Sequence, residues 1–163
     1  MAGRIPLPVR ASVRDLLTDL LGRSVEVRQA ADPLVLSPSR PALLATYRDD
    51  DGGMAAASAC ELPLAAGAGG AIGMMSASEV AEALREGGRL EGDLEEFFHE
   101  VANVMGKLLN TPTSPHVKLS ALYHVPGEVP ADVARVVLAP DVRLDYHIAV
   151  DGYADGTLTL LGS

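Results

Sequence analysis

The feature that most constrains the fold is a long amphipathic segment between residues 93 and 109. Its apolar side chains recur every three or four residues and form one broad face: Leu94, Phe97, Phe98, Val101, Val104, Met105, Leu108 and Leu109. This period is typical of an α-helix that buries one side. Pro112 and Pro115 prevent the helix from continuing, because proline lacks the amide hydrogen that a helix requires. The rest of the chain must therefore supply an apolar surface for this helix to cover.

Strand-like segments with alternating or β-branched residues supply that surface, and most of them are grouped along the chain. They occupy residues 24–29, 42–48, 54–62, 116–125, 134–140, 143–150 and 157–162. Two further helices are predicted over 12–21 and 76–87, the second opening with a capping box between Ser76 and Glu79. An Asp-Gly turn at 49–53 joins two strands as a hairpin. Grouped strands favour the α+β class, with an antiparallel or mixed sheet and long helices packed on it. No linker divides the chain, so we expect a single domain over 1–163.

The charge balance excludes several kinds of partner. The chain has 13 basic and 22 acidic residues, a net charge of −9, and no basic cluster. Nucleic acid and anionic membrane surfaces both require excess positive charge, so neither is an expected partner. The single cysteine, Cys60, lies in an apolar run and reads as a small buried hydrophobic residue. A lone cysteine and the lack of a signal peptide or long apolar span indicate a cytoplasmic protein.

Several motifs that resemble known sites fail on inspection. The glycine-rich passage at 65–73 has Ile72 where a dinucleotide-binding loop needs its third glycine, and no Gly-Lys-Ser/Thr follows. We interpret it as a flexible strand edge or as a close approach of helix and sheet. Glu96 and His99 match half of a di-iron helix motif, but the second half is missing. His116 and His124 are too far apart on one strand to share a metal. The sequence therefore predicts no metal site.

A polar stripe runs along the long helix. Glu96, Glu100, Asn103 and Lys107 advance by four, three and four residues, which places them on the side opposite the apolar face. Charged residues there can be an ordinary solvated surface. Asn103 is less easily explained in that way, because asparagine is a poor helix former in mid-helix.

The stripe carries a resemblance to a known family. Glu100 and Asn103 form a Glu-x-x-Asn motif, Gly-Lys-Leu follows it, and Pro126 stands after 22 intervening residues. In these features and in its order of elements the chain resembles the CheC/CheX family of response-regulator phosphatases, and CheX most closely. The first predicted helix contains no asparagine, so at most one such site exists, as in CheX. Glu96 departs from the Asp or Ser that the family often has at this position.

The resemblance implies a hydrolase of two-component or chemotaxis signalling that acts on a phosphorylated CheY-like receiver domain. Asn103 would orient the attacking water and Glu100 would pair with a lysine of the receiver, as the catalytic pair. Pro126 would support the site, and Glu96 would contact the partner. The receiver carries the aspartyl phosphate and its Mg²⁺, so the chain would need no cofactor of its own.

Two alternatives stay open beside catalysis. One is a non-catalytic CheX-like module that binds a receiver or another signalling partner, and the other is a structural domain related to flagellar switch proteins. CheX relatives dimerise by joining sheets, which implies a homodimer here. The segments 143–150 and 157–162 are the expected source of the free strand edge.

Overall fold

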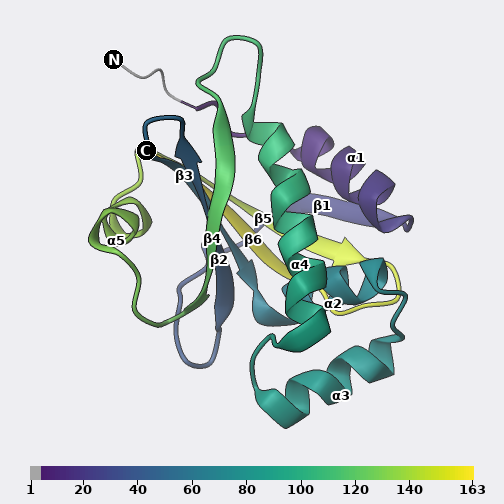
Figure 1. The fold of residues 1–163 in the computed structure, drawn as a ribbon. Coiled ribbons are helices and arrows are strands. Elements are labelled where there is room, and N and C mark those ends of the chain that lie inside the picture. Colours follow the sequence, from purple (N-terminus) through teal and green to yellow (C-terminus); the bar gives the residue numbers. More distant parts are fainter. Residues whose placement is uncertain (1–4) are drawn as a thin grey trace.

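The computed structural model describes residues 5–163 and is built on one six-stranded sheet (Figure 1). The strands are β1 (Val25–Gln29), β2 (Ala42–Asp49), β3 (Met54–Glu61), β4 (Val117–Val125), β5 (Val142–Val150) and β6 (Gly156–Gly162). Their order across the sheet is β1-β5-β6-β3-β2-β4, and every neighbouring pair is antiparallel. The α+β class predicted from the grouped strands is confirmed.

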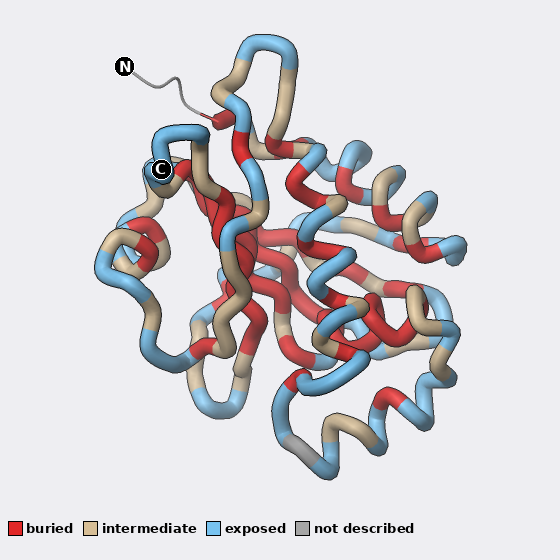
Figure 2. The backbone as a smooth tube through the Cα atoms, viewed as in Figure 1, coloured by how far each residue is buried: buried red, intermediate tan, exposed pale blue. Residues whose placement is uncertain are grey.

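The helices cover both faces of this sheet unequally. They are α1 (Arg10–Leu21), α2 (Leu62–Ile72), α3 (Ala77–Gly87), α4 (Gly92–Met105) and α5 (Ala131–Leu138), with a short 3-10 helix, η1 (Gly106–Leu109), after α4. Side chains of α1, α2 and α4 bury a large core against one face, whereas α5 covers a smaller core on the other (Figure 1). Burial is concentrated in the central strands and on the sheet-facing sides of the helices (Figure 2).

The periodic segments fold as predicted. The first helix ends at Leu21 and is capped by Gly22, whose positive φ of 65° suits glycine. The capping box between Ser76 and Glu79 is present at the start of α3. The long helix begins at Gly92 but tightens into η1 after Met105, so the predicted segment is an α-helix followed by one 3-10 turn. The hairpin at 49–53 is also present between β2 and β3.

The glycine-rich passage corrects one interpretation. It forms the buried helix α2 and is not a flexible strand edge. Its small residues matter at the contact with α4: a Cβ added at Gly69 would lie 3.0 Å from the carbonyl oxygen of Leu94 and 3.2 Å from the amide nitrogen of Phe98. The close approach that the glycines allow is therefore between two helices.

The segment 134–140 corrects a second interpretation. Its valines indicated a strand, but the structure has α5 there, beginning at Ala131. Val133 and Val136 lie three residues apart on one helical side and are both buried against the sheet. Arg48 on β2 forms an ion pair with Asp132 in the first turn, with Nη1 2.6 Å from Oδ2. Burial of a helical stripe thus outweighs the strand preference of valine.

The predicted dimer edge is also wrong in its location. β5 pairs with both β1 and β6, and β6 pairs with both β5 and β3. Both late strands are therefore interior and have no free edge to offer. Within residues 5–163 the sheet ends at β1 on one side and at β4 on the other.

Candidate functional site

Helix α4 is held firmly on the side that faces the sheet. Leu94, Phe98, Val101 and Met105 are all buried in the larger core. The hydroxyl of Tyr47, on β2, donates a 2.6 Å hydrogen bond to the carbonyl oxygen of Ala102. Burial raises the pKa of Tyr47 well above its usual range, so this hydroxyl stays protonated as a donor. These contacts on the buried side of α4 hold its exposed side in place.

The four residues of the polar stripe lie together on that exposed side. Glu96, Glu100 and Asn103 are exposed on α4, and Lys107 is exposed in η1. Within the described part of the chain, neither Glu100 nor Asn103 has a side-chain hydrogen bond or ion pair. Both can therefore meet a partner without first breaking an internal contact.

The two asparagines of the chain differ sharply. Asn110 is half-buried, donates to the carbonyl oxygens of Gly106 and Val117, and accepts from the amide of Val117 at 2.8 Å. These bonds join the end of η1 to the start of β4, so Asn110 is structural. Asn103 makes no such contact with the described residues. Of the two amides, only that of Asn103 is available to another molecule.

An open groove of about 300 Å³ lies beside the stripe, between α4 and the edge strand β4. Glu95, Glu96, His99 and Leu122 line it. The sequence indicated that His99 lies on a solvated helix face, which it does, but did not indicate that it lines a groove. The signal was its spacing, because His99 stands three residues after Glu96 and four before Asn103 and so shares their side of the helix.

His124, on β4, contacts the segment that leads into α4. Its Nε2 lies 3.0 Å from the carbonyl oxygen of Leu90, and its Nδ1 lies 3.0 Å from a guanidinium nitrogen of Arg89. A carbonyl only accepts and a guanidinium only donates, so the tautomer with hydrogen on Nε2 satisfies both. The same Nε2 is 3.9 Å from Glu95. These contacts tie the end of β4 to the start of α4.

Pro126 is not brought to the stripe. It follows β4 and lines a second groove with Val129 and Ala134, under α5. The end of β4 meets α4 near Glu95, and Asn103 stands eight residues further on, roughly 12 Å along a helix axis. The structure thus gathers Glu96, Glu100 and Asn103 on one helix and leaves Pro126 on the other side of the sheet.

Other features of the described chain bear on what the site can do. Cys60 is buried, as predicted, and burial raises the pKa of its thiol above the usual range, which makes it a poor nucleophile. Among residues 5–163 no group of three or more His, Cys, Asp or Glu side chains is placed to hold a metal ion. In the same range no helix is long and apolar enough to cross a membrane.

Comparisons with known proteins identify the fold. No protein-family model and no curated protein sequence matches the chain. It is similar in structure to FliY of Thermotoga maritima, with a TM-score of 0.55 and 11% identity over 98% of this chain and 86% of that one. It is similar to the FliM middle domain from H. pylori, with a TM-score of 0.55 and 7% identity over 94% of this chain and 84% of that one. FliM in a FliG–FliM complex from H. pylori gives 0.51 and 6%, over 94% and 85%.

At these identities the likeness establishes the fold alone. The chain has the α+β fold of FliY and the FliM middle domain, which is also the CheC/CheX-like fold. The fold that the Glu-x-x-Asn resemblance implied is therefore present.

Proposed function

We propose that this chain is a phosphatase of a phosphorylated CheY-like receiver domain. The observation that carries the proposal is the pair Glu100 and Asn103, exposed one turn apart and without partners in the described structure, on a helix locked into the core by its other side. The resemblance of this motif to CheX and the shared fold both support it.

The proposed reaction requires few chemical groups from the phosphatase itself. The receiver supplies the aspartyl phosphate and the Mg²⁺ beside it, so the chain needs no nucleophile and no metal ion. What remains is to hold a water molecule in line with phosphorus, and positioning is most of what phosphoryl transfer requires. A primary amide both donates and accepts hydrogen bonds and does not titrate, which suits Asn103 to this task.

Glu100 and Glu96 would hold the receiver in place. The Glu100 carboxylate would pair with the receiver lysine that otherwise contacts the phosphoryl group, which requires an exposed and unpaired acid. Glu96 stands one turn earlier, between the stripe and the α4–β4 groove, and would contact the receiver beside the reacting group. Pro126 would act only through the support of β4, since it lies away from the stripe.

A second candidate function is a non-catalytic signalling module of the flagellar switch type. The likeness to FliY and to FliM, which is found in a complex with FliG, favours it. Such a module would bind a protein partner without changing the lifetime of a phosphorylated receiver.

The test measures loss of phosphate from the phosphorylated receivers of the host, with and without this protein. We expect the wild type to accelerate the loss for a cognate receiver, and Asn103→Ala to reduce that acceleration by about 100-fold or more, because the water loses its orienting group. Gln29→Ala is the matched control, since it removes the exposed amide of β1, at the opposite edge of the sheet from β4.

Equal acceleration by wild type and Asn103→Ala would contradict the catalytic role. Receiver binding without any acceleration, unchanged by Asn103→Ala, would instead establish the non-catalytic module. Glu100→Ala separates the roles further, because it should weaken receiver binding while Asn103→Ala leaves binding nearly intact.

A further inference from the structure

The turn between α2 and α3 contains a methionine in a strained backbone conformation. Met74 has a φ of 58°, and among residues 5–163 it is the one non-glycine residue with a positive φ. It follows Gly73, the residue that caps α2. Glycine most often occupies this left-handed position, because a Cβ is disfavoured there. Met74 therefore destabilises the fold relative to a glycine at the same place.

The side chain of Met74 is not packed against the rest of the protein. It is 91% exposed, the largest exposed fraction among the large apolar side chains of the described chain. The neighbouring Met75, by contrast, packs against the larger core. A residue that strains the backbone and buries no apolar surface points to a contact outside the chain, because such strain is concentrated at functional sites.

The turn that carries Met74 is held in place by segments far away in the sequence. The amide of Met75 donates a 2.8 Å hydrogen bond to the carbonyl oxygen of Gly70, and the hydroxyl of Tyr153 donates to the carbonyl oxygen of Met75. The guanidinium carbon of Arg23 lies 4.9 Å from the centre of the Tyr153 ring. The turn is thus joined to the β5–β6 connection and to the segment after α1, so Met74 projects from a fixed backbone.

This turn lies beside the polar stripe of α4. A Cβ added at Gly73 would overlap the ring of Phe97, so the backbone next to Met74 is in close contact with that ring. Phe97 is half-buried and stands three residues before Glu100, so the two lie side by side on the helix. The α4–β4 groove borders the stripe on its other side, through His99. A protein surface laid on the stripe therefore reaches Met74.

We propose that Met74, beside Phe97, forms the apolar contact through which the receiver domain docks on the stripe, an inference that rests on the receiver being the partner, as in the proposed function. The stripe is entirely polar, whereas protein interfaces place apolar anchors at their centre. Methionine suits this role, because its unbranched thioether side chain adapts to the shape of a partner.

The spacing along α4 fits one receiver on both contacts. Phe97 stands six residues before Asn103, roughly 9 Å along the helix axis. That separation is well inside the footprint of a standard protein interface, about 800 Å² on each partner. The receiver presents an apolar patch to Met74 while its phosphorylated aspartate faces Asn103.

The test measures the dissociation constant for a host receiver held in a phosphorylated-like state by beryllofluoride and Mg²⁺, which keeps turnover out of the measurement. We expect Met74→Gly to raise this constant about tenfold, because the apolar contact is lost. Its melting temperature should be unchanged or higher, because glycine relieves the strain at positive φ. Met74→Leu keeps an apolar side chain and should bind within about threefold of wild type.

Val35→Gly is the matched control, because it makes the same kind of substitution at another exposed apolar residue, in the segment before β2. It should leave the dissociation constant unchanged. The rate of phosphate loss at saturating protein should be equal for Met74→Gly and wild type, since the docking contact lies outside the catalytic pair.

The outcomes separate this inference from the proposed function. A wild type that accelerates phosphate loss, beside a Met74→Gly variant with the wild-type dissociation constant, would overturn the docking contact and leave the phosphatase standing. Receiver binding without acceleration would contradict the phosphatase alone, and a tenfold loss of that binding in Met74→Gly would still support the contact. A wild type that binds no host receiver would overturn both.

Discussion

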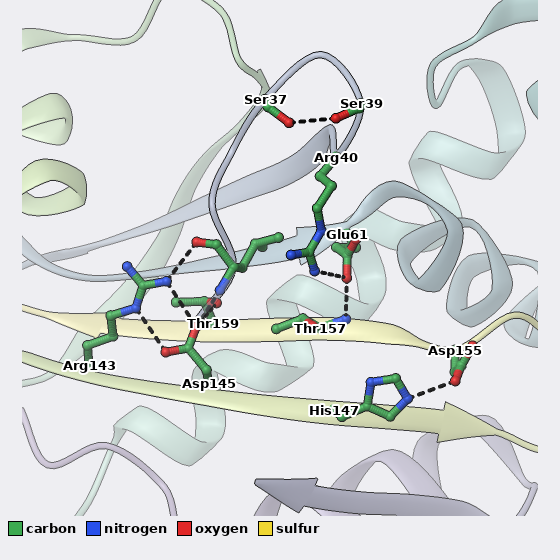
Figure 3. Close-up of polar contacts among 11 residues, drawn as sticks. Ser37, Ser39, Arg40, Glu61, Arg143, Asp145, His147, Asp155, Thr157 and Thr159 are labelled. Carbon is green, nitrogen blue, oxygen red and sulfur yellow. Dashed lines mark hydrogen bonds and ion pairs between the residues drawn. The ribbon is translucent and has the colours of Figure 1, made fainter. Parts of the chain in front are cut away.

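At the scale of single residues, Asp145 is a buried carboxylate that accepts hydrogen bonds from three other residues (Figure 3). Burial raises the pKa of Asp145, but hydrogen bonds from Arg143, from the Thr159 hydroxyl at 2.6 Å and from the amide of Leu34 outweigh burial and hold the pKa below its ordinary value. A carboxyl whose pKa is lowered in the folded state stabilises that state above the pKa of the unfolded chain. The contribution is lost as the pH falls through the folded-state pKa.

We therefore expect Asp145→Asn to lower the free energy of unfolding by about 1–3 kcal/mol at pH 7, through lost charge-assisted hydrogen bonds. The difference from wild type should shrink as the pH falls below about 4, because protonated aspartic acid then resembles asparagine. Urea denaturation at pH 7 and at lower pH measures both values. Asp19→Asn is the control, because it changes an exposed acid of α1. A difference that stays constant with pH would contradict the assignment.

At the scale of elements, the packing of α2 against α4 decides where the stripe stands. Alanine at an exposed helical glycine usually stabilises a protein by up to about 1 kcal/mol. At Gly69 the added Cβ would press on backbone atoms of α4, which cannot rotate away as a side chain would. We expect Gly69→Ala to lower the free energy of unfolding by about 1–2 kcal/mol, since overpacking outweighs the gain in helix preference.

The test is whether Gly69→Ala lowers or raises the free energy of unfolding. Thermal or urea unfolding that shows Gly69→Ala to be as stable as wild type, or more stable, would mean that the helices separate without cost. The adjacent Ala68→Gly serves as the reverse substitution in the same helix, and it should destabilise through lower helix preference and a small loss of buried surface.

The elements that the sequence predicted well are those whose burial has one regular period. Residues 93–109 bury one helical face and 76–87 begin with a capping box, and both appear where expected. The helix α2 is buried on nearly all sides, so it shows no period, and its glycines indicated a flexible strand edge or a close approach of helix and sheet. In α5 the valines favoured a strand until burial against the sheet decided otherwise. Local patterns fail where contacts with distant segments set the burial.

At the scale of the whole molecule, the sheet separates two surfaces with different chemistry. The stripe on α4 is polar, and the groove beside α5 is apolar. Sites that share no residues and no packing layer usually respond independently to mutation. We expect Leu138→Asp, a change beside the groove, to retain at least about half of the receiver phosphatase rate per chain.

Combining Leu138→Asp with Asn103→Ala provides the check. The double variant should show the phosphatase rate of Asn103→Ala alone. A phosphatase rate that falls by more than half with Leu138→Asp would show that the two faces are coupled, and would contradict their independence.

By itself the sequence determined the α+β class, the long helix and the exposed side on which Glu96, Glu100 and Asn103 stand, because all of these depend on residues close together in the chain. Only the tertiary structure decided that β5 and β6 are interior, that Pro126 lies across the sheet from the stripe, and that Leu138 stands exposed beside a hollow. Those features depend on which strands pair and which faces meet. Such pairings join residues far apart in the chain, so local periodicity does not predict them.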